Sequence, residues 1–249
     1  MNDVVSPGLS HQSLQAKSTL EEIRQRFDHE LERFSQLEKG QQATVDAPLV
    51  LELVAEAAAT HLRAGDAILD LGCGAGNFTL RVLQKVNPLV CHLVDLSGPM
   101  LERARQRIGS TGTATVHTHH TDLRKLDLPA NSVSGILAGA SLHHLREEGD
   151  WADVFAKLHF WLKPGGRLYV ADLVTFDTPE IQHLMWNRYG RYLEGLGGVE
   201  YREKVFAYIE KEDSPRSLPF QLDLLRRVGF SRYDVLHRNQ VFACYFAAK

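Results

Sequence analysis

The sequence has few cysteines, no long apolar run and no excess of positive charge. Its three cysteines, Cys73, Cys91 and Cys244, are widely separated and odd in number. That pattern argues against a disulfide framework and against a cysteine-rich zinc site. No apolar run approaches the roughly 20 residues that a membrane-spanning helix requires. Because the formal net charge is −3, the chain as a whole shows no attraction to the phosphates of nucleic acids.

Repeats, low-complexity tracts and a secretory signal are also missing from the sequence. The first residues, "MNDVVSPGLSHQSLQAKSTLEE", lack the basic-then-apolar layout of such a signal, so we expect a cytoplasmic protein. With 249 residues, 44% of them hydrophobic and 24% charged, the chain is typical of one large globular core with a small accessory element.

The middle of the chain alternates between strand-like and helical segments. Alternation at these lengths indicates βαβ units and a parallel sheet with helices on both faces. We predict strands at 67–71, 89–96, 114–121, 132–139 and 167–173, and helices at 77–86, 98–108 and 150–162.

Helical segments are predicted before this alternating region. A first helix begins near "STLEEI", where Ser18 with Glu21, or Thr19 with Glu22, has capping-box spacing. It ends near Gly40, and a second helix follows with Asp46 as its N-cap. We assign residues 1–45 to a tail and lid helix.

After the fifth strand the alternation stops. Residues 175–216 are aromatic and charged, and they form a segment too long for an ordinary connection. We therefore predict a helical cap over the carboxyl ends of the strands, in which "EKED" (210–213) is a solvated helix end. Residues 217–249 read as a last helix and an antiparallel hairpin that complete the 46–174 core.

A glycine-rich loop follows the first strand, in "ILDLGCGAGN" (68–77). A phosphate-binding loop would end in Gly-Lys-Ser/Thr, and no lysine stands there. A dinucleotide fingerprint would place its third glycine at position 77, which is Asn77. A nucleoside pocket without phosphate fits better, because Asp70 can accept a hydrogen bond from an ammonium group but would repel a pyrophosphate.

Two further acids follow predicted strands. Asp95 ends the second strand, where a carboxylate can accept from both ribose hydroxyls, and Asp122 follows the third, where it could meet an exocyclic amine. Open α/β sheets bind ligands at the carboxyl ends of their strands. Three acids in register with a glycine loop therefore predict a nucleoside site.

In this order, "DLGCGAG", "VDLSGPML", "TDLRKLDLP", "GILAGASLHHL" and "LKPGGRLYVADL" resemble the class I S-adenosylmethionine-dependent methyltransferases. The resemblance covers residues 47–174 closely. It implies a Rossmann-like α/β fold with a seven-stranded, mostly parallel sheet and an antiparallel last strand. It also implies S-adenosylmethionine as cofactor and S-adenosylhomocysteine as product.

The resemblance further implies roles for individual residues. The loop residues would line the methionine part of the cofactor, Asp70 would lie near its ammonium and Asp95 would hold the ribose. Cys73 reads as a small packed residue of that loop and not as a nucleophile. The implied cofactor-binding set is Asp70, Gly72, Cys73, Gly74, Gly76, Asp95, Leu96, Met100, Asp122, Leu123 and Ala138, with Leu96 and Met100 on the adenine face, Asp122 and Leu123 at its edge and Ala138 beside the sulfonium.

The N-terminal helix, the cap and the last 26 residues are also similar to the carboxy-S-adenosylmethionine synthase of tRNA wobble-uridine modification. That activity would need a cap arginine to pair with the carboxylated cofactor, and Arg188, Arg202 and Arg216 are the candidates. The similarity leaves a homodimer open. The glycine loop of this chain follows the ordinary methyltransferase pattern.

Catalytic candidates lie beyond the fourth strand and in the cap. His143 and His144 could remove a proton from the acceptor, although such histidines also cap or pack the next helix. Tyr189 belongs to a helical stripe that could face the cofactor or the core. "HTHH" (117–120) invites a metal interpretation, but no third ligand is fixed nearby, so we expect no metal.

The sequence thus predicts a methyltransferase that transfers a methyl group to a small-molecule acceptor, with neither a nucleic acid nor a membrane as partner. Two alternatives stay open. One is a carboxy-S-adenosylmethionine synthase-like protein, and the other is a cofactor-binding protein without transferase activity.

Overall fold

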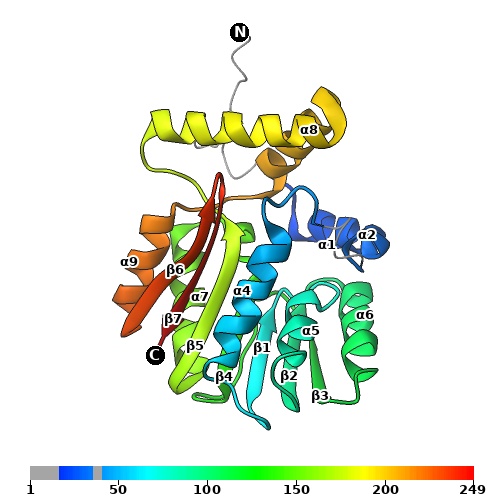
Figure 1. Cartoon of the computed structure of the whole chain (residues 1–249), viewed down its shortest axis with the longest axis vertical. Coiled ribbons are helices and arrows are strands. Elements are labelled where there is room, and N and C mark those ends of the chain that lie inside the picture. The colour runs from blue at the N-terminus through cyan, green and yellow to red at the C-terminus, as the bar shows by residue number, and fades with distance from the viewer. Residues whose placement is uncertain (1–16, 36–40) are drawn as a thin grey trace.

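The fold is built around a seven-stranded sheet with the spatial order β3-β2-β1-β4-β5-β7-β6 (Figure 1). A computed structural model describes residues 17–35 and 41–249. The strands are β1 (Ala67–Leu71), β2 (Leu89–Asp95), β3 (Ala114–His120), β4 (Val133–Gly139), β5 (Leu162–Leu173), β6 (Arg232–Asn239) and β7 (Phe242–Ala248).

Strands β1 to β5 pair in parallel, and β7 enters antiparallel between β5 and β6. This confirms the predicted fold, including the closing hairpin. The strand order reverses between β1 and β4, since β2 and β3 lie on one side of β1 while β4 and β5 lie on the other. Such a reversal opens a crevice at the carboxyl ends of the strands, which is where ligands bind in open α/β sheets.

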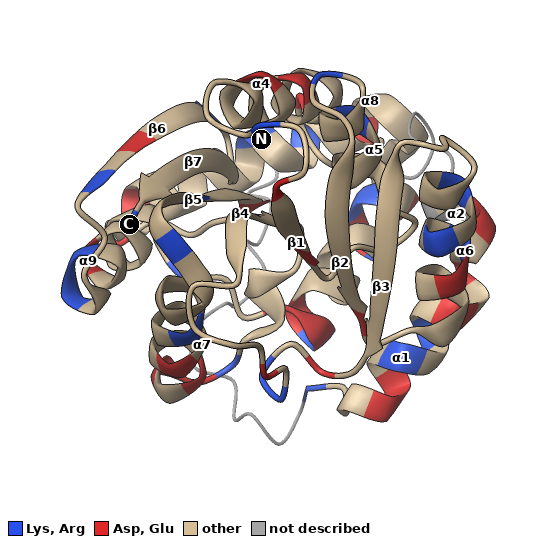
Figure 2. Cartoon of the chain, turned by 90° about the horizontal axis from the view of Figure 1, so that it is seen from below, with Lys and Arg blue, Asp and Glu red and all other residues tan. Residues whose placement is uncertain are grey.

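Helices cover both faces of the sheet. One buried cluster joins the sheet to α4 (Ala47–Ala59), α5 (Asn77–Leu83) and α6 (Gly98–Gly109). The other joins it to α7 (Glu148–Trp161) and α9 (Leu218–Val228). Figure 2 shows charges of both signs on the flanking helices and few on the central strands, as expected for parallel strands buried on both faces.

The long helix α8 (Pro179–Glu212) lies across the carboxyl end of the sheet. Its backbone breaks at Gly197 and Gly198, where φ is +77° at Gly198, so it forms two helical halves. Buried aromatic residues hold it to the sheet, among them Trp186, Tyr189 and Phe206, which pack around Leu173 at the end of β5. Among the described helices, none combines the length and the apolar content that crossing a bilayer requires.

The N-terminal elements α1 (Leu20–His29) and α2 (Leu31–Ser35) lie beside α6. Thr19 and Glu22 form the capping box of α1, whereas Ser18 is buried and its backbone N–H donates to the carbonyl of Lys211, 3.0 Å away. The predicted single helix is therefore two helices that part after His29. Its predicted end, Gly40, lies outside the described residues.

The N-cap prediction for Asp46 is wrong in its detail. Its backbone is left-handed, with φ +58°, and its side chain caps nothing. The carboxylate instead accepts hydrogen bonds from His237 Nε2 at 2.9 Å and from Asn239 Nδ2 at 2.7 Å. It therefore ties the start of α4 to β6. These contacts are nearly 200 residues apart in sequence, which is why local pattern did not reveal them.

Candidate active site

A cavity of about 700 Å³ lies at the carboxyl ends of the strands, between the glycine loop, α1 and the second half of α8. Residues predicted from the sequence line it together with residues of the lid and the cap. The predicted residues on its wall are Gly72, Cys73, Gly74, Asp95, Leu96, Met100, Asp122, Leu123, His143, His144 and Tyr189.

All three loop glycines have the positive φ that favours glycine: +73° at Gly72, +50° at Gly74 and +82° at Gly76. A Cβ at Gly72 would lie 2.6 Å from Cβ of Ser141, whereas one at Gly74 would meet open space. Gly76 is the N-cap of α5 and packs against Ala104 and Ile108 of α6. It does not line the cavity; its place in the cofactor site stays a prediction, and in the structure it allows α5 and α6 to pack closely.

Asp70 and Ala138 also lie off the cavity wall. Asp70 is 2% exposed, and its Oδ2 accepts a hydrogen bond from Thr79 Oγ1 at 2.7 Å. Burial raises the pKa of this carboxyl to about 6, against the lowering effect of the Thr79 hydrogen bonds. At the end of β4, Gly139 and Ala140 face the cavity in place of Ala138.

Asp95 ends β2 at the cavity wall. Its Oδ2 accepts from the backbone N–H of Gly74 at 2.7 Å, and its Oδ1 accepts from that of Ser97 at 2.8 Å. Burial raises the pKa of this carboxyl. The side chain is thus fixed in orientation, and each carboxylate oxygen keeps a lone pair for a ligand hydroxyl.

Asp122 follows β3 and pairs with Arg124, whose Nη2 lies 2.7 Å from Oδ2. Burial alone would raise the pKa of Asp122, but the hydrogen bonds from Arg124 outweigh it and the pKa is lowered. The carboxylate is therefore ionised at neutral pH and can accept from an exocyclic amine. Buried Met100 contributes apolar surface to the same cavity.

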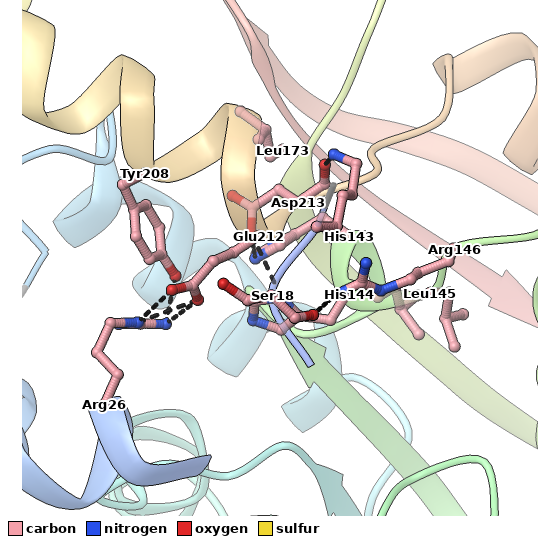
Figure 3. A network of polar contacts seen from close by, with 12 residues as sticks. Ser18, Arg26, His143, His144, Leu145, Arg146, Leu173, Tyr208, Glu212 and Asp213 are labelled. Atoms are coloured by element: carbon pink, nitrogen blue, oxygen red, sulfur yellow. Dashed lines mark hydrogen bonds and ion pairs between the residues drawn. The ribbon is translucent and has the colours of Figure 1, made fainter. Parts of the chain in front are cut away.

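His143 and His144 form the short helix η2 (Leu142–His144) after β4. Nδ1 of His143 is hydrogen-bonded to Asp172 Oδ1, and Nε2 of His143 lies 3.7 Å from Asp213 Oδ1. Asp172 is itself fixed, since its Oδ2 accepts from the backbone N–H of Leu142 at 2.8 Å. The histidine is held between two buried carboxylates (Figure 3).

These buried groups shift one another's pKa values. Burial alone would lower the pKa of His143, but Asp172 and Asp213 outweigh it and raise the pKa to about 9. Burial raises the pKa of Asp213 to about 7. His144 has its pKa lowered well below the usual range, first by burial and then by the charge of His143.

Tyr189 lies on the cavity wall but is 1% exposed, and its hydroxyl donates to the carbonyl of Ala43 at 2.9 Å. Burial raises the pKa of the Tyr189 hydroxyl above its usual range. Its catalytic role stays a prediction. The three cap arginines, Arg188, Arg202 and Arg216, do not line the cavity, and Arg202 pairs with Glu194 instead. The cations on the wall are Arg26, Arg124 and Lys204.

Sequence reasoning missed two buried acids of the cavity, Asp172 and Asp213. Asp172 follows the pattern of the other acids, because it stands near the carboxyl end of β5, so its position carried a signal. Asp213 belongs to "EKED", which was predicted to be solvated, yet Glu212 is 6% exposed and Asp213 is 2% exposed. The prediction failed because the lid helix α1 covers this end of α8.

Comparisons with known proteins find similarity to methyltransferases. Residues 68–166 match a family described as a methyltransferase domain. Carboxy-S-adenosyl-L-methionine synthase of Shewanella loihica is 29% identical over 187 residues, 73% of this chain and 75% of that protein. Demethylmenaquinone methyltransferase of Listeria monocytogenes is 25% identical over 196 residues, 76% of this chain and 80% of that protein.

A solved structure shares the fold. Phosphoethanolamine N-methyltransferase 2 of Haemonchus contortus, bound to phosphomonomethylethanolamine and S-adenosylhomocysteine, superposes with a TM-score of 0.59 at 17% identity. The match covers 87% of this chain and 44% of that one. Sheet order, glycine loop, strand-end acids and sequence relatives lead to one conclusion. Residues 68–166 form a methyltransferase domain, and the chain as a whole is similar in sequence and fold to S-adenosylmethionine-dependent methyltransferases.

Proposed function

We propose that this enzyme transfers the methyl group of S-adenosylmethionine to a small-molecule acceptor that binds under α8. The observation that carries the proposal is the shared cavity. One wall is made by the glycine loop and the strand-end acids, and the opposite wall by Tyr201, Lys204 and Tyr208 of α8. Cofactor and acceptor can therefore lie in one enclosed space, as a direct displacement requires.

The residues of the loop side fit the cofactor. The open space above Gly74 leaves room for a ligand against the backbone, and Asp95 offers its remaining lone pairs to ribose hydroxyls. We assign Asp122 and Leu123 to the adenine edge, Leu96 and Met100 to its face, and Gly72 and Cys73 to the methionine part. Asp70 would act on the ammonium group through the loop above it. When bound, the cofactor supplies an electrophilic methyl group.

The acceptor side is formed by His143, His144 and Asp213 together with the aromatic rings of α8. His143 and Asp213 are buried, and both line the cavity together with buried Asp172. They can bind and orient an acceptor that carries a hydroxyl or amine, while α1 and α8 exclude water.

Two observations favour a small acceptor over a nucleic acid. Residues of α1 and α8 line the cavity, so the acceptor side lies beneath these two helices. The chain also carries a net charge of −3, whereas nucleic acid binding usually uses a basic face. The relative named demethylmenaquinone methyltransferase offers a small-molecule precedent.

A cofactor-consumption screen tests the proposal. Purified protein and S-adenosylmethionine are incubated with separate pools of amines, thiols, phenols, quinols and nucleosides, and S-adenosylhomocysteine is quantified. We expect turnover with at least one small-molecule pool and a product heavier by one methylene. Turnover with bulk tRNA alone, or with no pool, would contradict the proposal.

The mass of ligand retained through purification separates ordinary from carboxylated cofactor. We expect S-adenosylmethionine or S-adenosylhomocysteine, because the three candidate arginines lie off the cavity wall. A carboxylated cofactor in the purified protein would reverse that expectation.

A further inference from the structure

The strongest unexplained feature of the molecule is a convergence of His143, His144 and Asp213. One ligand atom of each lies within 4.8 Å of the others. Asp213 Oδ1 is 3.7 Å from His143 Nε2 and 3.4 Å from His144 Nδ1. Two ligands of one transition-metal ion typically lie about 3 to 3.5 Å apart, since each bond is about 2.0–2.2 Å.

The converging atoms are unsatisfied. Neither Nδ1 of His144 nor Oδ1 of Asp213 has a hydrogen-bond partner within residues 17–35 and 41–249, although both atoms are buried. The separation of 3.7 Å between Asp213 and His143 is also too long for a hydrogen bond. The two orphaned atoms lie 3.4 Å apart, and an ion bound to both would satisfy them, whereas leaving a buried polar atom unpaired costs about 1–3 kcal/mol.

The outer nitrogen of each histidine is held by an oxygen acceptor. Nδ1 of His143 is hydrogen-bonded to the carboxylate of Asp172, and the ring of His144 is hydrogen-bonded to the backbone carbonyl of Glu212. This leaves Nε2 of His143 and Nδ1 of His144 directed inward, and a metal ion that binds there displaces the proton that Nε2 of His143 otherwise carries. Metal-binding histidines are almost always oriented in this way by a carboxylate or a carbonyl.

Neighbouring cations are directed elsewhere. Arg26 pairs with Glu212, with Nη2 2.7 Å from Oε2, and Nζ of Lys17 donates to the backbone carbonyls of Glu210 and Asp213. Among the described residues, no lysine or arginine side chain pairs with the carboxylate of Asp172 or Asp213. Apart from His143 itself, no fixed cation within the described residues balances these two buried carboxylates.

We propose that His143, His144 and Asp213 bind a divalent first-row transition-metal ion at the acceptor end of the cavity, with Asp172 orienting His143. Two imidazoles and one carboxylate suit Fe²⁺, Co²⁺ or Zn²⁺. All three ligands line the cavity, so the remaining coordination positions face the space where an acceptor would bind. No local sequence pattern indicates this site, because Asp213 is 69 residues beyond His144.

The second histidine cluster provides a matched control. His92 of β2 stacks on His117 and His119 of β3, with ring centroids 5.0 and 5.4 Å apart, but Nδ1 of His92 and Nε2 of His119 are already 3.1 Å apart and bonded to each other. Its histidines could bind metal ions adventitiously. A substitution in this cluster therefore tests whether metal binding is specific to His143, His144 and Asp213.

The experiment is a Co²⁺ titration of the chelator-treated full chain, followed by visible absorption and checked by calorimetry with Zn²⁺. We expect one ion per chain, binding weakened about tenfold or more by His144→Gln and by Asp213→Asn, and unchanged binding in His117→Gln. Thermal unfolding checks that each variant is folded. If Asp213→Asn is not folded, the Co²⁺ affinity of His144→Gln alone tests the proposed site. Because the readout needs no methyl acceptor, it is independent of the proposed function.

Two results would overturn the inference. One is the absence of saturable Co²⁺ binding to the wild-type chain up to millimolar ion. The other is binding that His117→Gln removes while folded His144→Gln retains it. Either result would leave the cluster as a network of hydrogen-bonded histidine and carboxylates that holds α8 to β4 and β5.

Discussion

Arg26 of α1 forms a bidentate ion pair with the carboxylate of Glu212 at the end of α8, with Nη2 2.7 Å from Oε2 and Nε 2.9 Å from Oε1. The same guanidinium donates to the hydroxyl of Tyr208 at 2.6 Å. Because Arg26 and Tyr208 both line the cavity, this contact joins the lid to the cap directly over the site.

Arg26→Ala should therefore loosen the lid. It leaves Glu212, which is 6% exposed, as an unpaired buried charge, and removing one partner of a buried pair costs about 3–5 kcal/mol. We expect faster amide hydrogen exchange across residues 20–29 and a higher KM for the acceptor. Arg105→Ala is the control, since it breaks an exposed pair with Glu102 and should change neither quantity. If amide hydrogen exchange across residues 20–29 were unaltered in Arg26→Ala, the contact between Arg26 and Glu212 would not hold the lid in place.

Asp95→Ala should weaken S-adenosylhomocysteine binding. The substitution removes the proposed partner of the ribose and also the acceptor of the Gly74 backbone N–H. We expect a loss of about 1–3 kcal/mol in binding free energy, the cost of leaving buried polar groups unpaired. Calorimetry measures it, and wild-type affinity in this variant would overturn the assignment of the cofactor site.

Gly72→Ala and Gly74→Ala should separate folding from binding. A methyl group at Gly72 would lie 2.6 Å from Ser141 Cβ, so we expect a lower free energy of unfolding by about 1–3 kcal/mol from overpacking, plus about 1–2 kcal/mol for the left-handed backbone.

At Gly74 the methyl group meets open space on the cavity wall. In Gly74→Ala the free energy of unfolding, measured with denaturant, should therefore fall only by the cost of the left-handed backbone. The variant should also bind S-adenosylhomocysteine less well. Gly109→Ala, in open space at the end of α6, is the control and should affect neither. Equal unfolding midpoints for the variants at 72 and 74 would contradict this reading of the loop.

The sequence was sufficient for the fold and for the cofactor side of the cavity. Buried parallel strands read as near-continuous apolar runs, and the residue that follows each of them reaches the same edge of the sheet. Asp95 and Asp122 could be placed there from pattern alone, because their positions depend only on where a strand ends.

The acceptor side depended on long-range packing that local pattern does not encode. Glu212 and Asp213 look like solvated residues at a helix end, and only the docking of α1 buries them. Gly76 has the same sequence context as Gly72 and Gly74, yet it faces α6 and not the cavity. Sequence periodicity indicates which face of an element is apolar, but it does not indicate which other element covers that face.

Asp70→Asn should move stability and cofactor binding in opposite directions. Burial raises the folded-state pKa of Asp70 from its ordinary value of 3.8 to about 6, so the folded state holds its proton more tightly than the unfolded state. Stability from this group is therefore full below about pH 4 and is lost as pH rises to about 6. At pH 7 the ionised carboxylate costs up to about 3 kcal/mol, which Asp70→Asn should recover in part.

Because we propose that this carboxylate acts on the ammonium group of the cofactor, the same variant should bind S-adenosylhomocysteine more weakly. Urea unfolding at pH 4.5 and pH 7.5 measures the first effect, and calorimetry at pH 7.5 measures the second. Asp153→Asn, an exposed acid on α7, should alter neither. If Asp70→Asn were no more stable than the wild type at pH 7.5, the ionised carboxylate of Asp70 would not be destabilising the fold. If it gained stability and kept full affinity, Asp70 would serve the loop alone and the ammonium would need another partner.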